Sequence, residues 1–138
     1  MYFALGVALA LSAVIPATRA GSAPVARSLM PAAQTIEEYV RGYFADAPIM
    51  IDVARCESRF RQFDKDGSVH RGEINPKDVG VMQVNEFYHS KTADKLDLDL
   101  YTIEGNLSYA KYLFEKEGTT PWLSSSPCWG KENQIARK

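Results

Sequence analysis

Apolar residues recur between positions 49 and 60 at the spacing of an amphipathic helix. Four of them follow one another at steps of four, three and four residues: Ile49, Val53, Cys56 and Phe60. Such a stripe lies on one face of a helix and packs against a core. Pro48 suits the first turn, because the N–H that proline lacks would have no partner there, and Asp46 is placed to cap the helix. We therefore predict a helix that starts near Pro48.

Helical spacing also occurs before and after this segment. Thr35 and Glu38 stand at the positions of a capping box. The apolar residues of the helix that they would open are Ile36, Tyr39, Val40, Tyr43 and Phe44. Near the other end, Thr102 can cap a helix that runs from Ile103 to about Glu117, where Gly118 would end it.

The segment 61–78 is charged and contains helix breakers. Gly67, Gly72 and the Asn75-Pro76 pair interrupt it, so we predict a loop or a short hairpin. Its stretch Asp64-Lys65-Asp66-Gly67-Ser68 faintly resembles a calcium loop. It lacks the third acidic position before the glycine and the distal glutamate of such loops, so a polar turn is expected.

One carboxylate, Glu57, interrupts the apolar pattern of the Pro48 helix. The side chains three and four positions away are Val53, Ala54, Phe60 and Arg61, of which three are apolar. Partial burial disfavours the charged form of a carboxyl, so we expect the pKa of Glu57 to be raised. A raised pKa would make it a proton donor at neutral pH. Alternatively, Glu57 turns to solvent or pairs with Arg61, and the spacing does not decide between these.

Three short motifs follow one another along the chain. They are Glu57-Ser58-x-Phe60, then Gly80-Val81-Met82-Gln83-Val84-Asn85, then a helix with Ala110 and Tyr112-Leu113. In this order and at this spacing, they resemble the signatures of the soluble-type lytic transglycosylase domain of the lysozyme-like superfamily. In that family an Asn stands seven residues before the Tyr, whereas Asn106 precedes Tyr112 by six. The resemblance therefore carries over Tyr112 and not Asn106.

The resemblance implies a fold, an activity and a set of site residues. The fold would be mainly α, with α+β possible, and lysozyme-like, with the segment after the Glu57 helix forming one wall of a substrate cleft. The activity would be cleavage of the β-1,4 bond between MurNAc and GlcNAc in peptidoglycan, with formation of 1,6-anhydro-MurNAc ends. Glu57 would be the catalytic acid and base. The glycan-binding residues would be Ser58, Met82, Gln83, Asn85 and Tyr112.

Two alternatives stay open. A hydrolytic muramidase acting on the same bond needs a second carboxylate as nucleophile or base. The candidates are Asp64, Asp66, Glu73 and Asp78. A non-catalytic glycan-binding or secretion-assembly module would bind glycan equally well with Gln in place of Glu57, so the presence of this glutamate counts against it.

The two cysteines, Cys56 and Cys128, are the minimum for one disulfide in an exported chain. If they pair, the bond ties the C-terminal segment to the Glu57 helix. A thiol nucleophile is the rival interpretation, but neither His70 nor His89 lies in a motif that would link it to Cys56. Scattered Cys and His give no metal-ligand spacing, so neither a metal nor a cofactor is expected. Two aromatic residues are equally well suited to the core and to stacking on a sugar: Trp122 and Trp129.

Composition is compatible with one packed domain. The chain has 138 residues, of which 46% are hydrophobic and 11% aromatic. A formal net charge of −1 argues against a dedicated nucleic-acid binder. Peptidoglycan strands are the expected partner, and no sign of an oligomer is visible, so a monomer is expected.

An apolar run extends from Tyr2 to Ile15 and is broken by Pro16, and Thr18-Arg19-Ala20 follows with the small residues that a signal peptidase reads. We predict a signal peptide over residues 1–20, with a retained membrane anchor as the alternative. The remaining segments are a linker over 21–34, the transglycosylase-like domain over 35–130 and a tail over 131–138. The expected location is exported: periplasm, cell envelope or extracellular.

Overall fold

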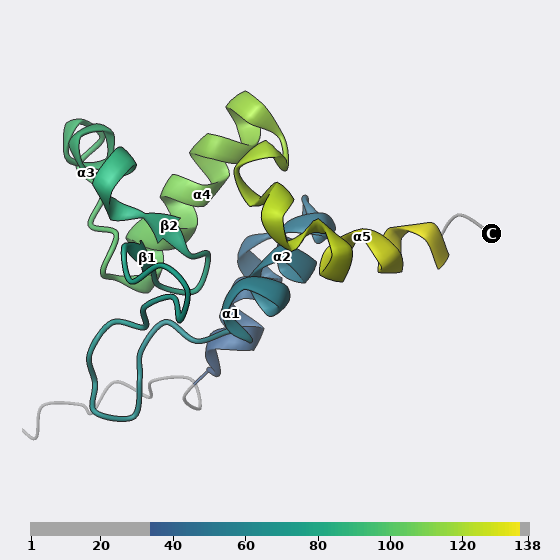
Figure 1. The fold of residues 1–138 in the computed structure, drawn as a ribbon, viewed down its shortest axis with the longest axis horizontal. Helices are drawn as coiled ribbons and strands as arrows, with labels where there is room; N and C mark the ends of the chain where they lie inside the picture. Colours follow the sequence, from purple (N-terminus) through teal and green to yellow (C-terminus); the bar gives the residue numbers. More distant parts are fainter. Residues whose placement is uncertain (1–33, 136–138) are drawn as a thin grey trace, which may run out of the picture. The chain divides into compact units, whose positions relative to one another are not determined.

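The part of the chain described by a computed structural model, residues 34–135, is mainly helical (Figure 1). Side chains are described as far as Lys131. The elements follow in the order α1 (Ile36–Tyr43), α2 (Pro48–Ser58), β1 (Asp78–Val79), β2 (Val84–Asn85), α3 (Glu86–Lys95), α4 (Ile103–Glu117), the 3-10 helix η1 (Thr120–Ser125) and α5 (Ser126–Ile135). The expectation of a mainly α protein is confirmed.

The described residues cover the predicted domain and part of the predicted tail. The predicted signal peptide and the predicted linker up to residue 33 lie outside the described residues. The described residues 34–135 belong to one compact unit. Its last helix, α5, continues to Ile135 and so enters the segment 131–138 that we predicted as a tail.

Helix α1 begins as the sequence predicts, whereas α2 does not. The Thr35 hydroxyl accepts a hydrogen bond from the Glu38 N–H at 3.2 Å, and the Glu38 carboxylate accepts one from the Thr35 N–H at 2.8 Å, which completes the capping box. At α2, Ala47 is the N-cap and supplies no side-chain bond. Asp46, our predicted cap, instead pairs with Lys111 on α4, with 3.0 Å between Oδ2 and Nζ; that prediction was wrong.

Helix α2 ends at Ser58, so Phe60, the last residue of the predicted apolar stripe, lies outside the helix. Arg59 and Phe60 have positive φ angles of 55° and 59°, a left-handed conformation that stops a helix. The Ser58 hydroxyl accepts a hydrogen bond from the Arg61 N–H at 3.1 Å and so supports the turn that follows. Glu57 therefore lies in the last turn of α2, at the point where the chain leaves the helix.

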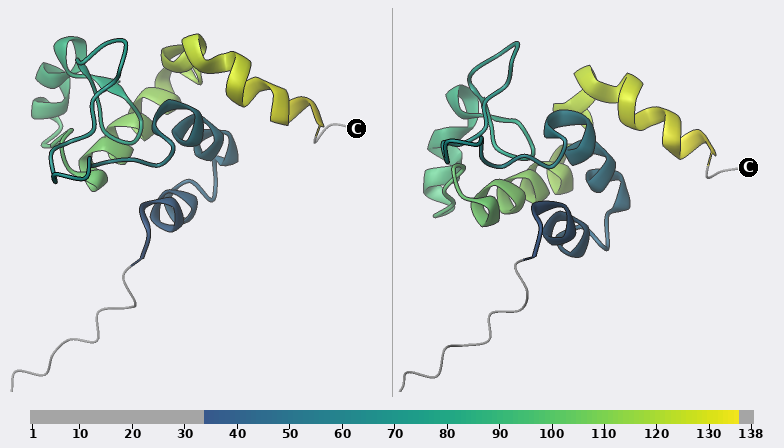
Figure 2. Two further views of the ribbon diagram at one scale, coloured as in Figure 1. Left: turned by 60° about the horizontal axis from the view of Figure 1, so that its bottom comes forward. Right: turned by 90° about the horizontal axis from the view of Figure 1, so that it is seen from below.

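The predicted loop or hairpin between α2 and β1 is confirmed as a loop. Figures 1 and 2 show it as a long connection without a helix, with isolated bridges between Phe63 and Val69 and between Arg71 and Val79. The turn at its tip is polar as expected, because the Asp66 carboxylate accepts hydrogen bonds from the N–H and hydroxyl of Ser68.

A buried asparagine, Asn106 of α4, holds the turn between β1 and β2. Its Oδ1 accepts a hydrogen bond from the Met82 N–H at 2.9 Å, and its Nδ2 donates to the carbonyls of Val79 and Leu100, each at 3.0 Å. Asn106 is fully buried. Its amide thus satisfies three buried backbone groups, two of them in this turn, that would otherwise lack partners.

A second buried amide, Gln62, supports the same turn from the loop after α2. Its Oε1 accepts a hydrogen bond from the Val81 N–H at 2.8 Å, and its Nε2 donates to the Tyr101 carbonyl at 3.1 Å. Gly80 allows this close approach, since a Cβ there would lie 2.5 Å from Asn106 Nδ2 and 2.7 Å from Gln62 Oε1. Its φ of 73° also favours glycine.

Helix α3 has no counterpart among the predicted elements. Its residues form a poor apolar stripe, because Phe87 and Tyr88 are largely exposed and Ala93 is its buried residue. The helix is instead started by Asn85, whose Oδ1 accepts a hydrogen bond from the Tyr88 N–H at 3.3 Å.

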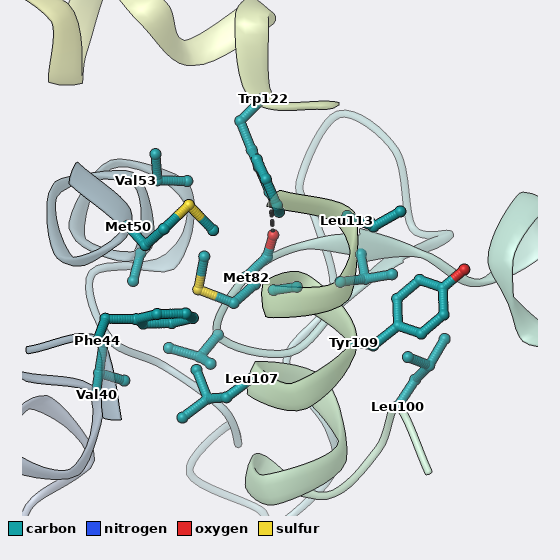
Figure 3. Close-up of a cluster of buried hydrophobic side chains, with 14 of the residues drawn as sticks. Val40, Phe44, Met50, Val53, Met82, Leu100, Leu107, Tyr109, Leu113 and Trp122 are labelled. Carbon is teal, nitrogen blue, oxygen red and sulfur yellow. Dashed lines mark hydrogen bonds between the residues drawn. The ribbon is translucent and has the colours of Figure 1, made fainter. Parts of the chain in front are cut away.

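The core is drawn in Figure 3. It contains side chains from both ends of the described chain and from the turn between them, including Val40, Phe44, Met50, Val53, Met82, Leu107, Tyr109 and Trp122. The indole N–H of Trp122 donates to the Met82 carbonyl at 2.9 Å (Figure 3). Trp122 and Trp129 are 3% and 8% exposed, so both belong to the core.

Cys56 and Cys128 form a disulfide, with 6.0 Å between their Cα atoms. The bond joins the last turn of α2 to α5, which also pack against each other and against η1. It confirms the predicted pairing and is typical of an oxidising compartment. Because neither cysteine is free, the thiol-nucleophile alternative is excluded for the bonded protein.

Removing this disulfide should destabilise the fold. The bond closes a loop with a sequence separation of 72, so Cys56→Ala combined with Cys128→Ala should lower the free energy of unfolding by about 4 kcal/mol. Urea unfolding followed by circular dichroism measures this loss. Wild-type protein unfolded in the presence of a dithiol is the control and should show the same loss. An unchanged midpoint would contradict the prediction.

Glu86 connects the long loop to α3 and to the segment before α4. Its carboxylate accepts hydrogen bonds from Arg71 Nη1 at 3.0 Å, from Lys77 Nζ at 3.3 Å and from the Tyr101 hydroxyl at 2.7 Å. These bonds, that of Arg71 first and that of Tyr101 next, lower the pKa of Glu86 to about 2. The ionised carboxylate therefore fixes one end of the loop.

The low pKa of Glu86 predicts a specific dependence of stability on pH. Since its pKa of about 2 in the fold lies below the roughly 4.3 of an unfolded chain, Glu86 stabilises the protein above that higher value. The contribution is lost as the pH falls toward 2. Glu86→Gln should therefore weaken the fall in urea midpoint between about pH 5 and 2. Glu73→Gln, at an exposed position on the same loop, is the control; an equal effect of both would refute the assignment.

Candidate functional site

Residues from six elements and from the turn between β1 and β2 line a small cavity of about 110 Å³. They are Glu57, Asp78, Gln83, Val84, Asn85, His89, Leu113, Pro121, Trp122 and Ser124. Two carboxyl groups, two amides and an imidazole thus meet beside an indole and aliphatic side chains. The predicted catalytic residue and two of the predicted binding residues are brought together here by parts of the chain that are far apart in sequence.

Glu57 is partly buried, and its surroundings act on its charge. Its Oε1 accepts a hydrogen bond from the Ser125 hydroxyl at 2.5 Å. Burial raises the pKa of Glu57 above its usual range, the Ser125 hydrogen bond opposes that shift, and the negative charge of Asp78 adds to it. The direction is the one expected from the sequence, so a proton stays on this carboxyl closer to neutral pH than on an ordinary glutamate.

The neighbours that surround Glu57 differ in part from those that helical spacing suggested. Phe60 has left the helix, because α2 ends at Ser58. The wall comes instead from η1, through Pro121, Trp122 and Ser124. Burial of the carboxyl therefore depends on a segment that is distant in sequence. Ser125, at the end of that segment, lies 68 residues after Glu57.

Of the four candidate second carboxylates, Asp78 lines the cavity. Its Oδ1 accepts hydrogen bonds from Asn85 Nδ2 at 2.7 Å and from Asn75 Nδ2 at 3.3 Å, which orient it at the end of the long loop. The other three lie elsewhere: Asp64 contacts His70, Asp66 contacts Ser68, and Glu73 is exposed.

Gln83 and Asn85 are half-buried and line the cavity. Gln83 has a positive φ of 50°, and its Nε2 donates to the Gly80 carbonyl at 2.9 Å. Asn85 donates to Asp78 and also caps α3. These bonds fix both amides in the cavity lining, and such amides suit a ligand with hydroxyl and amide groups. Contact with a glycan stays a prediction for both.

The other three predicted binding residues lie outside the cavity lining. Ser58 is buried and donates to the Val81 carbonyl at 2.7 Å, so it ties the end of α2 to the turn. Met82 is fully buried in the core. Tyr112 is half-buried, with Lys116 Nζ 4.5 Å from its ring centroid. Contact with a glycan stays a prediction for these three residues.

Leu113, the residue after Tyr112, lines the cavity instead. It stands seven residues after Asn106, so both lie on the same face of α4 after two helical turns. The resemblance had carried over Tyr112 and set Asn106 aside. In the structure, Asn106 reaches the turn of β1 and β2 and Leu113 reaches the cavity, while contact of Tyr112 with a glycan stays a prediction.

His89 is a cavity residue that our sequence reasoning did not assign to this site. Its Nδ1 lies 3.1 Å from the Tyr109 hydroxyl, and burial lowers the pKa of His89, which favours the neutral imidazole. The signal was the spacing to Asn85, four residues earlier, but it could be used only after α3 had been recognised as a helix.

A larger hollow of about 290 Å³ lies between α3 and the segment before α4, lined in part by Asp94, Asp97 and Asp99. Glu57 is not among its lining residues. Within residues 34–135, no group of three or more His, Cys, Asp or Glu side chains is placed to hold a metal ion. Over the same residues, no helix is both long and apolar enough to cross a membrane.

Comparison with known proteins returns no match to a family model, to a curated protein or to a solved structure. The chemistry available to the site is therefore judged from its residues. A carboxyl with a raised pKa can donate a proton, a second carboxylate lies on the same cavity, and fixed amides stand beside both. Such a set suits acid-catalysed cleavage of a polar substrate.

The support that Asn106 gives to the cavity wall can be measured. Asn106→Leu leaves three buried backbone groups without partners, so it should lower the free energy of unfolding by about 3 kcal/mol or more. Hydrogen exchange of the Met82 amide should also become faster. Asn75→Leu, at an exposed position, should cost less than about 1 kcal/mol. Equal losses in both variants would contradict the role given to Asn106.

Proposed function

We propose that this protein is a peptidoglycan lytic transglycosylase with a lysozyme-like fold. It would cleave the β-1,4 bond between MurNAc and GlcNAc and leave 1,6-anhydro-MurNAc ends. The observation that carries the proposal is the partly buried Glu57, whose pKa is raised by burial and whose carboxyl faces a cavity with two fixed amides. The three sequence motifs supply the reaction class, and the disulfide is compatible with an exported protein.

In the proposed reaction Glu57 acts twice. Protonated Glu57 first gives its proton to the glycosidic oxygen, and the bond between that oxygen and C1 of MurNAc breaks. The ionised Glu57 then takes the proton of the C6 hydroxyl, and O6 bonds to C1 to close the anhydro ring. No water is consumed, so the two products together have the mass of the substrate. Glu57 ends protonated, as it began.

The surroundings of Glu57 suit both halves of this reaction. Burial raises its pKa and favours the protonated form that the first step needs. The Ser125 hydroxyl offers a hydrogen bond to the ionised form that the second step needs. Gln83 and Asn85 would bind hydroxyl and acetamido groups of the glycan. Because the cavity is small, the glycan would lie across its mouth with the reacting bond at Glu57.

A muramidase that hydrolyses the same bond is the second candidate, and the position of Asp78 favours it. Asp78 lines the cavity with Glu57 and its charge acts on that residue, as expected of a second carboxylate in a glycosidase. In that reaction water would replace the C6 hydroxyl, and the product would carry an ordinary reducing end.

Mass spectrometry of muropeptides released from purified peptidoglycan distinguishes these reactions. A transglycosylase gives products one water lighter than reducing muropeptides, and Glu57→Gln should lower their release at least about 100-fold. Asp78→Asn should leave most of the release intact. Glu73→Gln, an exposed carboxylate outside the cavity, is the control.

Each other outcome has a definite meaning. Reducing ends that disappear in Asp78→Asn would replace the proposal with the muramidase. Release that is unchanged in Glu57→Gln would reject both enzymes. Binding of glycan without release would leave the non-catalytic module.

A further inference from the structure

Ser125 lies where η1 meets α5 and forms a chain of hydrogen bonds that ends on Glu57. The indole N–H of Trp129 donates to Ser125 Oγ at 2.9 Å, and the Ser125 hydroxyl lies 2.5 Å from Glu57 Oε1. The same hydroxyl lies 3.0 Å from the Trp122 carbonyl. A serine hydroxyl has one proton and two acceptor positions, so Trp129 occupies one acceptor position and the proton has two possible receivers.

These two receivers correspond to the two protonation states of Glu57. When Glu57 is ionised, its carboxylate is the stronger acceptor and takes the Ser125 proton. When Glu57 is protonated, Ser125 can donate to the Trp122 carbonyl and accept the proton of the carboxyl. Ser125 therefore has a hydrogen bond to offer Glu57 in both states without a change of its own position, and the bond to the ionised carboxylate is the stronger of the two because it is charge-assisted.

Two features hold Ser125 in this place. Trp129 is almost fully buried, and its indole N–H also lies 3.2 Å from the Trp122 carbonyl. The Cys56–Cys128 disulfide joins the residue before Glu57 to the residue before Trp129. A covalent bond thus connects the two backbones that carry the ends of the hydrogen-bond chain.

We propose that Ser125 is a positioning residue that fixes the Glu57 carboxyl in both of its protonation states, and that the Cys56–Cys128 disulfide keeps the two in register. The importance of this arrangement for turnover rests on the proposed acid and base role of Glu57. The geometry of these hydrogen bonds, and their effect on the titration of Glu57, do not depend on that role.

The other groups around Glu57 define what a change at Ser125 would reveal. The titratable groups that share its cavity are Asp78 from β1 and His89 from α3. The cavity residues from α4 and η1 have no titratable side chain near neutral pH: Leu113, Pro121, Trp122 and Ser124. Asp78 opposes the ionised form of Glu57, whereas the hydrogen bond of Ser125 supports it. Loss of the Ser125 hydroxyl should therefore move the titration of Glu57 to higher pH.

The test is a titration of the Glu57 carboxyl carbon by NMR in protein labelled with ¹³C-glutamate, with the resonance assigned by its absence in Glu57→Gln. Ser125→Ala should shift the midpoint to higher pH, and the alkaline limb of the pH–rate profile should shift in the same direction. Ser126→Ala makes the same chemical change at the next residue and should shift neither. An unchanged midpoint in Ser125→Ala, or an equal shift in Ser126→Ala, would overturn the proposal.

The role of the disulfide is tested in two further backgrounds. Cys56→Ala with Cys128→Ala, and separately Trp129→Phe, should each shift the midpoint to higher pH. Adding Ser125→Ala to either should then shift it less than in the wild type, because the two changes act on one chain. A full additional shift in both backgrounds would overturn the coupling. Trp129→Phe keeps both the aromatic packing and the disulfide, so it tests the chain of hydrogen bonds from Trp129 through Ser125 to Glu57 by itself if the protein without the disulfide does not fold.

The two readouts separate this proposal from the proposed function. The titration requires no turnover, so a shifted midpoint in a protein that releases no muropeptides would keep the role of Ser125 and reject the transglycosylase. Released anhydro products with an unshifted midpoint would do the reverse.

Discussion

The hydrogen bonds of one buried amide, Asn106, determine where the cavity wall lies. This side chain satisfies backbone groups of Val79, Met82 and Leu100, and a buried backbone group without a partner is costly. The turn between β1 and β2 is therefore confined to the one position in which these bonds can form. Gly80 is required at the same place because a side chain there would occupy the space of the amide. The orientation of Gln83 and Asn85 follows from the position of the turn.

The second determinant of the site is the return of the chain to the end of α2. Glu57 alone is a glutamate in the last turn of a helix, and η1 supplies both part of the wall beside it and its hydroxyl donor, Ser125. The indole of Trp122 connects this part to the first, since it lies in the cavity wall and donates to the Met82 carbonyl. The two walls of the cavity are thus joined through the core, and a disturbance of either changes the surroundings of the carboxyl.

Local patterns in the sequence predicted the elements that they determine. The capping box at Thr35 and the helix from Thr102 to Gly118 were found because the side chains concerned act within one or two turns. Helix α3 was missed because its apolar residues do not form a stripe. The end of α2 was misplaced because Phe60 continues the spacing although its backbone is left-handed. Motifs in the sequence identified Glu57, Gln83 and Asn85 as candidate site residues. Ser125, His89 and Leu113 were missed because their places beside the site depend on contacts between distant segments.

The order of the segments along the chain has a consequence for the order in which the site is completed. The helix that carries Glu57 precedes the cavity wall formed by η1, and Cys128 follows Cys56 at a sequence separation of 72. During synthesis or export from the N-terminal end, the carboxyl is available long before its wall, its hydroxyl partner and its disulfide. A chain that stops before Trp129 retains Glu57 and the amide-bearing turn but lacks the enclosure that alters the carboxyl. The finished site therefore forms only after the chain up to Trp129 is present, well after the helix that carries Glu57.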